Sequence, residues 1–266
     1  MRRKHAWLAI LPPIFIIVLF AFGYLLAPND PEFVDMSIRF LDPCVQYPLG
    51  TDNMGRCVLS RLLYGGRITL GIVLAGSMMV TGLGTVLGLL LGGSRRGKSV
   101  VLESVITAIT AIPPIAYLII FIAAWGNSIF TMLVAITVSL MLRLLKLVKT
   151  RTEVEMHRAY VLCAIASGAS QVHILFVHIL PNLIWDVIHF VCMSCADMVL
   201  SIVGFSFIGL DLGDDVIDLG TMVSETHHYI IAHPALTWYP ILVILLCTAS
   251  FHFLGRWVER RAEPYA

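Results

Sequence analysis

Polar side chains recur at helical spacing within one long apolar stretch of the chain, and they are the residues most able to do chemistry. They are Asp186, His189, Met193, Asp197 and Ser201. Steps of three or four residues place side chains on one face of a helix, and polar groups inside an apolar span are costly enough to indicate a functional surface. We predict that this stripe lines a pore, with Asp197 as its deeper charge. Hydrogen bonding at an interface between helices is the alternative.

A possible metal-binding pattern overlaps this stripe. His189, Cys192 and Cys195 form H-x-x-C-x-x-C on the same helix, and imidazole and thiolate ligands suit nickel, copper or zinc. A pore that held a metal tightly would not release it, however, and small cysteines pack well between helices. We therefore expect no resident metal site, and these three residues remain weak candidates for contact with a metal.

Residues 92–99 match the phosphate-binding loop pattern G-x-x-x-x-G-K-S. This pattern binds a nucleotide when it joins a strand to a helix in an α/β domain. Here it lies between two apolar segments with no soluble sequence beside it, so we expect a tight turn in its place. We expect no cofactor and no enzymatic activity in this chain, so any ATP hydrolysis would belong to another polypeptide.

The elements that carry these residues follow from composition. The chain has 266 residues, of which 58% are hydrophobic and 13% charged, with a net charge of +1; soluble domains carry about 25% charged residues. The balanced charge gives no basic surface for nucleic acid. Six apolar segments are long enough to cross a bilayer: 7–27, 67–93, 100–124, 128–147, 183–210 and 235–255. We predict an all-α, multi-pass membrane protein with about six transmembrane helices in contact with lipid.

The loop charges predict its orientation. With the N-terminus inside, 14 of the 18 Lys and Arg residues fall on the cytoplasmic side, where basic residues are retained. The outer segments 28–66 and 211–234 carry ten acidic residues. Both termini are therefore predicted to be cytoplasmic, and residues 7–27 are read as a retained span because the apolar run is longer than that of a signal peptide. The chain divides into 1–66, the first span with an extracytoplasmic segment, and a core domain over 67–266.

Two further patterns predict helix contacts. Gly84, Gly88 and Gly92 recur every four residues, which favours close approach of a neighbouring helix. The cytoplasmic loop 148–182 is amphipathic. It predicts a small-residue helix stopped at Gly168, which suits a left-handed cap, and then a short helix from about 171 to 180 that ends at Pro181. This arrangement would form a protrusion that docks into a partner's groove; the alternative is a helix pair lying on the lipid surface.

This loop resembles the EAA loop of binding-protein-dependent permeases. Leu162-Cys163-Ala164 stands where the Glu-Ala-Ala would stand, and Gly168-Ala169-Ser170 and His178-Ile179-Leu180-Pro181-Asn182 follow. The segment 49–67 and the run Ser206-Phe207-Ile208-Gly209-Leu210 resemble the C-type permeases of dipeptide, oligopeptide and nickel ABC importers, as do Tyr229 and Pro234. The similarity runs from about residue 8 to residue 264.

The resemblance implies a type I ABC importer permease fold in the inner membrane of a bacterium or archaeon. The chain would form half of a pore, together with a B-type permease, two ATPase subunits and an extracytoplasmic solute-binding protein. The implied ATPase-coupling residues are Leu162, Cys163, Ala164, Ser167, Gly168, Ala169 and Pro181.

The implied cargo is nickel, a metal chelate or a small peptide. Val203 and Gly204, which precede the 206–210 run, resemble the nickel-type members and favour nickel or a metal chelate over dipeptides and oligopeptides. An ion-driven secondary transporter is the alternative class. It would normally show inverted repeats with broken helices, and Pro113-Pro114 could break the third span, although no matching interruption occurs in the second half.

Overall fold

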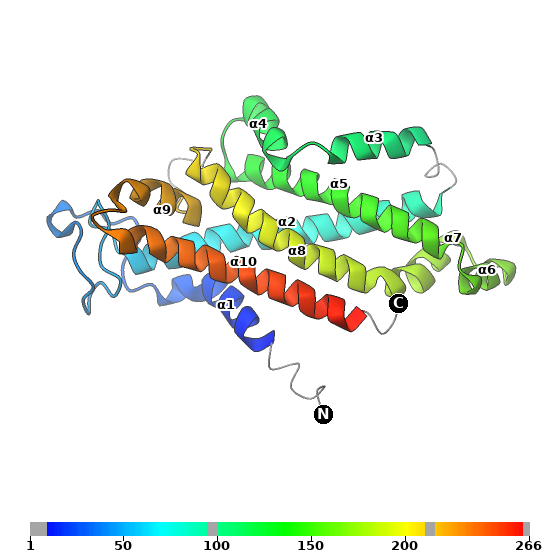
Figure 1. Ribbon diagram of the computed structural model, residues 1–266, viewed down its shortest axis with the longest axis horizontal. Helices are drawn as coiled ribbons and strands as arrows, with labels where there is room; N and C mark the ends of the chain where they lie inside the picture. Colours follow the sequence, from blue (N-terminus) through cyan, green and yellow to red (C-terminus); the bar gives the residue numbers. More distant parts are fainter. Residues whose placement is uncertain (1–9, 95–99, 211–215, 263–266) are drawn as a thin grey trace.

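The computed structural model describes residues 10–94, 100–210 and 216–262 (Figure 1). These residues form an elongated bundle of α-helices with an irregular segment at one end. Within the described ranges, the only β pairing is an isolated bridge between Thr51 and Cys57. The all-α architecture expected from the apolar segments is therefore confirmed.

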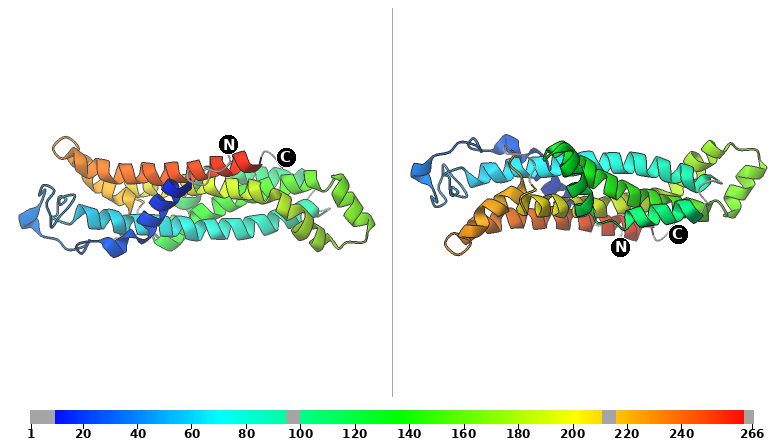
Figure 2. Two further views of the ribbon diagram at one scale, coloured as in Figure 1. Left: turned by 90° about the horizontal axis from the view of Figure 1, so that it is seen from below. Right: turned by 90° about the horizontal axis from the view of Figure 1, so that it is seen from above.

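Four long helices run along the bundle, and each is long and apolar enough to cross a membrane (Figures 1 and 2). They are α2 (Val58–Gly93), α5 (Ile129–Glu155), α8 (Leu180–Phe207) and α10 (Pro234–Ala262). The pair α3 (Val100–Thr110) and α4 (Pro114–Trp125) is long and apolar enough only when taken together, and its 82° bend makes it either a broken span or a re-entrant loop. The shorter apolar helix α1 (Leu11–Phe22) continues as a 3-10 turn over Gly23–Leu26. Each of the six predicted spans thus contains a helix.

Two of the predicted boundaries are corrected. The span 100–124 is not one continuous helix, because Pro113 is extended (ψ 149°) and α4 begins only at Pro114. Proline has no N–H for the helix ladder, and its ring clashes with the preceding turn. Helix α2 begins at Val58 and not at residue 67, so it includes residues 58–66, the last part of the segment assigned to the outer side.

The glycines of α2 make the expected close contact with α5. A Cβ atom on Gly88 would lie 2.7 Å from the Cβ of Val148, and one on Gly92 would lie 2.6 Å from the carbonyl oxygen of Lys149. Gly84 faces Leu144 in the same way, at 3.1 Å. Small residues thus allow the two backbones to approach closely, as in other membrane helix pairs.

The connecting segments gather at the two ends of the bundle (Figure 2). The short helices α6 (Ala159–Ala166) and α7 (Gln171–His173) lie at one end, and α9 (Leu219–Thr226) lies at the other, beside the irregular segment 27–57. This grouping agrees with the division of the loops into two sides. The assignment of the α6 end to the cytoplasm rests on the loop charges.

Candidate functional site

The loop between α5 and α8 contains a helix that ends in a tight glycine turn. Gly168 has φ +84°, its N–H donates to the carbonyl of Ile165 at 3.0 Å, and the N–H of Ala169 donates to the carbonyl of Ala164 at 3.1 Å. This pair of bonds is the Schellman motif, in which glycine is favoured because it adopts the left-handed conformation without strain. The predicted stop at Gly168 is confirmed.

One face of α6 is anchored and the other is open. Val161 is fully buried, and Ala164 and Ala169 are partly buried against the core. On the open side, Leu162 is 55% exposed and Ile165 47% exposed. The other predicted coupling residues are exposed as well: Cys163, Ser167, Gly168 and Pro181. The result is an apolar and small-residue surface that projects from the end of the bundle.

The second helix of the loop differs from the prediction. It does not end at Pro181, because the chain remains helical from Gln171 to Phe207. Residues Ile174–Ile179 form a π-helical segment in which Leu180 donates to Leu175. This wider turn directly precedes Pro181, and it explains how the helix accommodates a residue that has no N–H and a bulky ring. The loop between α5 and α8 is thus continuous with α8.

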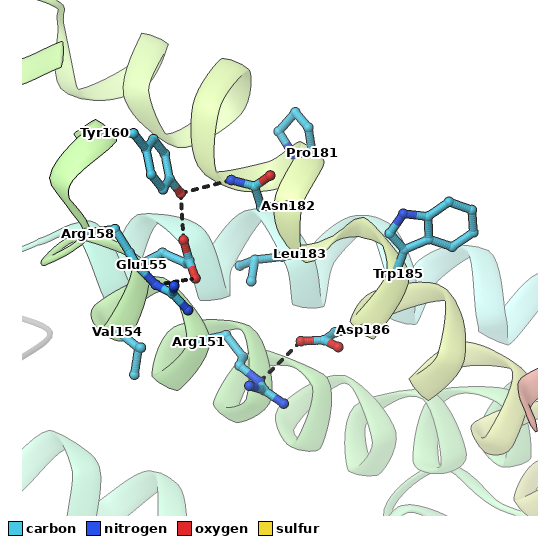
Figure 3. A pocket seen from close by; sticks show the side chains of 10 residues that line it. All are labelled: Arg151, Val154, Glu155, Arg158, Tyr160, Pro181, Asn182, Leu183, Trp185 and Asp186. Atoms are coloured by element: carbon cyan, nitrogen blue, oxygen red, sulfur yellow. Dashed lines mark hydrogen bonds and ion pairs between the residues drawn. The ribbon is translucent and has the colours of Figure 1, made fainter. Parts of the chain in front are cut away.

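A cavity of about 420 Å³ lies at the base of this loop, between α5, α6 and α8 (Figure 3). Tyr160 donates its hydroxyl hydrogen to Glu155 at 2.6 Å and accepts from Asn182 at 3.0 Å, while Arg158 pairs with Glu155 at 3.4 Å. Burial raises the pKa of Tyr160, and its hydrogen bond to Glu155 adds to the rise. Tyr160 therefore remains a neutral donor that ties α6 to both long helices.

Two more cavities continue from this one along α5 and α8. Arg151, which pairs with Asp186 at 3.2 Å, lines both the first cavity and a second of about 430 Å³. Arg143 lines the second cavity and a third of about 370 Å³, which also includes Asp197 and Ser201. Polar residues therefore follow one side of the bundle from its middle to the loop between α5 and α8.

The structure divides the predicted stripe of α8 between two surroundings. Asp186, Asp197 and Ser201 line these cavities. His189 instead contacts the carbonyl of Gly255 at 2.9 Å, and Met193 lies 3.1 Å from the ring nitrogen of His252, so both face α10. Within the described ranges, no three His, Cys, Asp or Glu side chains are grouped so as to hold a metal ion, and this includes His189, Cys192 and Cys195.

The phosphate-loop pattern begins inside a helix. Gly92 and Gly93 are the last two residues of α2, and the carbonyl of Gly93 accepts a hydrogen bond from Gln171 at 2.6 Å. Gly93 therefore joins α2 to the loop between α5 and α8, whereas Gly92 faces Lys149 and Thr152 of α5. The other described residue of the pattern, Ser94, caps α2, and residues 95–99 lie outside the described ranges.

At the opposite end, a buried charge network joins the segment before α2 to α9. The carboxylate of Asp52 accepts from Arg56 at 2.8 Å and from Arg61 at 2.7 Å. Glu225 accepts from the same two arginines at 2.7 and 2.6 Å. The side chains of Asp52 and Arg61 are only 2% and 3% exposed. Asp52 and Arg61 lie in the 49–67 segment singled out by sequence, but their partner on α9 was not foreseen.

The run Ser206–Leu210 closes α8 at the same end. Gly209 has φ +84° and repeats the Schellman pattern, with Leu210 donating to the carbonyl of Phe205 at 2.9 Å. Ser206 donates to the buried carboxylate of Asp218 at 2.7 Å, and Asp218 caps the N-terminus of α9. The motif thus fixes α9, and with it Glu225, against the bundle.

Comparison with known proteins places these features in context. Residues 84–264 match the family described as the binding-protein-dependent transport system inner membrane component. The nickel transport system permease protein NikC of Escherichia coli is 26% identical over 240 residues, covering 90% of this chain and 86% of that protein. The dipeptide transport system permease protein DppC of Haemophilus influenzae is 29% identical over 268 residues, covering 96% and 90%.

Two further similarities extend over most of the chain. The glutathione transport system permease protein GsiD of Pectobacterium atrosepticum is 27% identical over 266 residues, covering 98% of this chain and 88% of that protein. Among solved structures, a chain of the MetNI methionine ABC transporter in an inward-facing conformation aligns with a TM-score of 0.58 and 15% identity. That alignment covers 77% of this chain and 96% of the other, and it supports the fold alone.

Proposed function

Because this chain belongs to the family of binding-protein-dependent transport system inner membrane components, we propose that it forms one half of the translocation pathway of an ATP-driven importer. It is an ABC importer permease of the peptide/nickel family and a multi-pass inner-membrane protein. A second, B-type permease would supply the other half of the pathway. Two ATPase subunits and an extracytoplasmic solute-binding protein would complete the importer.

The observation that best supports this proposal is the open face of α6. Leu162 and Ile165 are large apolar residues exposed at the end of the bundle, and such a surface is typical of a docking site. The rigid Schellman turn at Gly168 fixes its shape. We propose that this face, with Cys163, Ser167 and Gly168 beside it, binds an ATPase subunit, and that movement of the ATPases is transmitted to the pathway through α8.

The pathway itself is proposed to follow the three cavities along α5 and α8. Their polar lining includes Asp186, Asp197 and Ser201. Charged side chains facing hydrocarbon are costly, so this side of the bundle is suited to face water or the second permease. His189 and Met193 would not contact the cargo. They would support the pathway indirectly, because they hold α8 against α10.

The cargo is proposed to be nickel, a metal chelate or a small peptide. The named relatives are permeases of nickel, dipeptide and glutathione transport systems. The resemblance of Val203-Gly204 to the nickel-type members favours nickel or a metal chelate. A solute-binding protein would deliver the cargo at the end formed by segment 27–57 and α9, where acidic residues are numerous.

The docking role of α6 can be tested by co-purification. Leu162→Glu and Ile165→Glu place a charge on the open face without disturbing the buried Val161, so each should lower the amount of ATPase that co-purifies with the permease by about ten-fold, since a desolvated charge at an interface costs more than 1.4 kcal/mol. Arg256→Glu, at an exposed position near the end of α10, is the matched control and should retain the ATPase.

Circular dichroism of each purified variant would show whether the bundle is intact. Normal ATPase recovery with folded Leu162→Glu and Ile165→Glu variants would contradict the docking role of α6.

A further inference from the structure

The cavity in the middle of the bundle contains an unpaired charge of each sign. Arg143, near the middle of α5, and Asp197, on α8, both line the cavity of about 370 Å³. Neither forms an ion pair with another residue in the described ranges. Arg143 and Asp197 thus line one cavity without forming an ion pair with each other. Each charge can therefore bind an oppositely charged group of a molecule in the cavity.

The position of these charges requires a polar partner. Both helices are among the four apolar enough to cross a membrane, and an ionised side chain within a membrane span is costly unless it faces water or an opposite charge. Asp197 is exposed and Arg143 is half-buried, so neither charge is covered by this chain. A cargo that carried both an ammonium and a carboxylate group would satisfy both.

The neighbouring cavity indicates which cargo is disfavoured. Arg143 and Lys146 line it together with Arg151, and among the described residues only Arg151 of these three is paired with an acid, Asp186. A passage with this excess of positive charge repels a bare divalent cation and attracts an anionic group. In addition, no cluster of metal-binding side chains occurs within the described residues.

We propose that Arg143 and Asp197 are specificity-determining residues that bind, respectively, the carboxylate and the ammonium group of a small zwitterionic cargo. The inference rests on the proposed function and deepens it, because it selects among the possible cargoes. The zwitterion passes as a free dipeptide. A free metal cation lacks both groups, and an amino-acid chelate lacks the ammonium group because its amino nitrogen is bound to the metal. Arginine suits the first role because its planar guanidinium binds carboxylates through paired hydrogen bonds.

The test uses the full importer, with both permeases, the ATPases and the binding protein, in proteoliposomes. Uptake is measured for a dipeptide, its C-terminal amide, its N-acetyl derivative, a nickel–histidine chelate and free Ni²⁺. Each result is expressed as the ratio of variant to wild type for the same cargo. Because the binding protein is a separate and unchanged chain, its own preference among cargoes cancels in this ratio.

Arg143→Gln should lower uptake of the dipeptide by about ten-fold or more, as expected for the loss of a charge-assisted hydrogen bond. Arg143→Lys should retain most of the uptake. The ratio for the amide should stay near one, because the amide has no carboxylate for Arg143 to bind. Asp197→Asn should lower uptake of the dipeptide while leaving that of the N-acetyl derivative unchanged.

Co-purification of the ATPases with each variant separates a failure of assembly from a failure of recognition. Equal ratios for the charged and the capped cargoes would overturn the inference and leave the importer function standing. Uptake by the wild type of only free Ni²⁺ or the nickel–histidine chelate, and not of the dipeptide, would do the same. An assembled wild-type importer that took up none of these cargoes would overturn the proposed function, and the inference with it.

Discussion

The charge network of Asp52, Arg56, Arg61 and Glu225 lies at the end of the bundle opposite α6 and joins residues that are far apart in the sequence. Arg61 and Glu225 are separated by 164 positions, yet their side chains lie 2.6 Å apart. Each arginine contacts both carboxylates, so two positive and two negative charges balance within the network. Removing one partner from a buried pair leaves the other charge without compensation, which is strongly destabilising.

The network predicts a clear difference between two of its members. Arg61→Met leaves Asp52, whose side chain is 2% exposed, without one of its two arginines, and should lower the free energy of unfolding by about 3 kcal/mol. Glu225→Gln changes a group that is 36% exposed and should cost about 1 kcal/mol or less. Thermal unfolding of the purified permease in detergent would measure both. Equal losses would show that burial does not determine the strength of this network.

Among single residues, the sequence pointed to some that line these cavities or join the charge network and missed others, for a physical reason. Asp197 and Ser201 were found because helical spacing within a single apolar segment is visible in sequence. Arg143 was missed because it was counted among the cytoplasmic charges at the end of a span, whereas it lies near the middle of α5. Glu225 was missed because its partners lie on another element, and no local pattern encodes such a pairing.

At the scale of elements, the contact between α2 and α5 depends on glycine at defined positions. Gly88 is one of the tightly packed positions, since an added Cβ would meet both Val148 and the carbonyl of Leu145 at less than 3.0 Å. Gly82 lies on the same helix but has nothing within 4 Å of an added Cβ. Replacing each of these two glycines with alanine therefore distinguishes the effect of packing on stability from the effect of helix propensity.

Gly88→Ala should destabilise the protein by about 1–3 kcal/mol, because the added methyl group overpacks the contact with α5. Gly82→Ala should be neutral or stabilise it by up to about 1 kcal/mol, because alanine is the better helix former. The midpoints of thermal unfolding would show both effects. A stable Gly88→Ala variant would mean that α2 and α5 do not require this close approach.

Helix existence was predictable from sequence, but helix continuity was not. Six apolar runs gave the six helical segments, because burial in lipid requires long apolar helices. Two proline sites then behaved in opposite ways: Pro113-Pro114 bends the chain by 82°, whereas Pro181 continues a helix. The difference arises from the preceding backbone, which is extended at Pro113 and π-helical before Pro181. Such a choice depends on packing and is not visible in the residue types.

At the scale of the whole molecule, two native cysteines test the predicted orientation. Cys44 and Cys163 are exposed and lie in the segments at opposite ends of the bundle. A membrane-impermeant maleimide added to intact spheroplasts should label Cys44 and not Cys163. Cys163 should react only in inverted vesicles that have been stripped of peripheral subunits with urea. Cys44→Ser and Cys163→Ser identify the labelled residue in each case, and the reverse pattern of labelling would contradict the orientation.

The length of α2 has a consequence for how the importer meets its surroundings. A helix of 36 residues is about 54 Å long at 1.5 Å per residue, whereas the hydrocarbon layer of a bilayer is about 30 Å thick. Since Arg61 and the charge network lie at the beginning of α2, the excess length extends mainly at that end. The segment 27–57 and α9 would then stand clear of the lipid headgroups, so a protein arriving there would meet a raised rim surrounded by water and not the membrane surface.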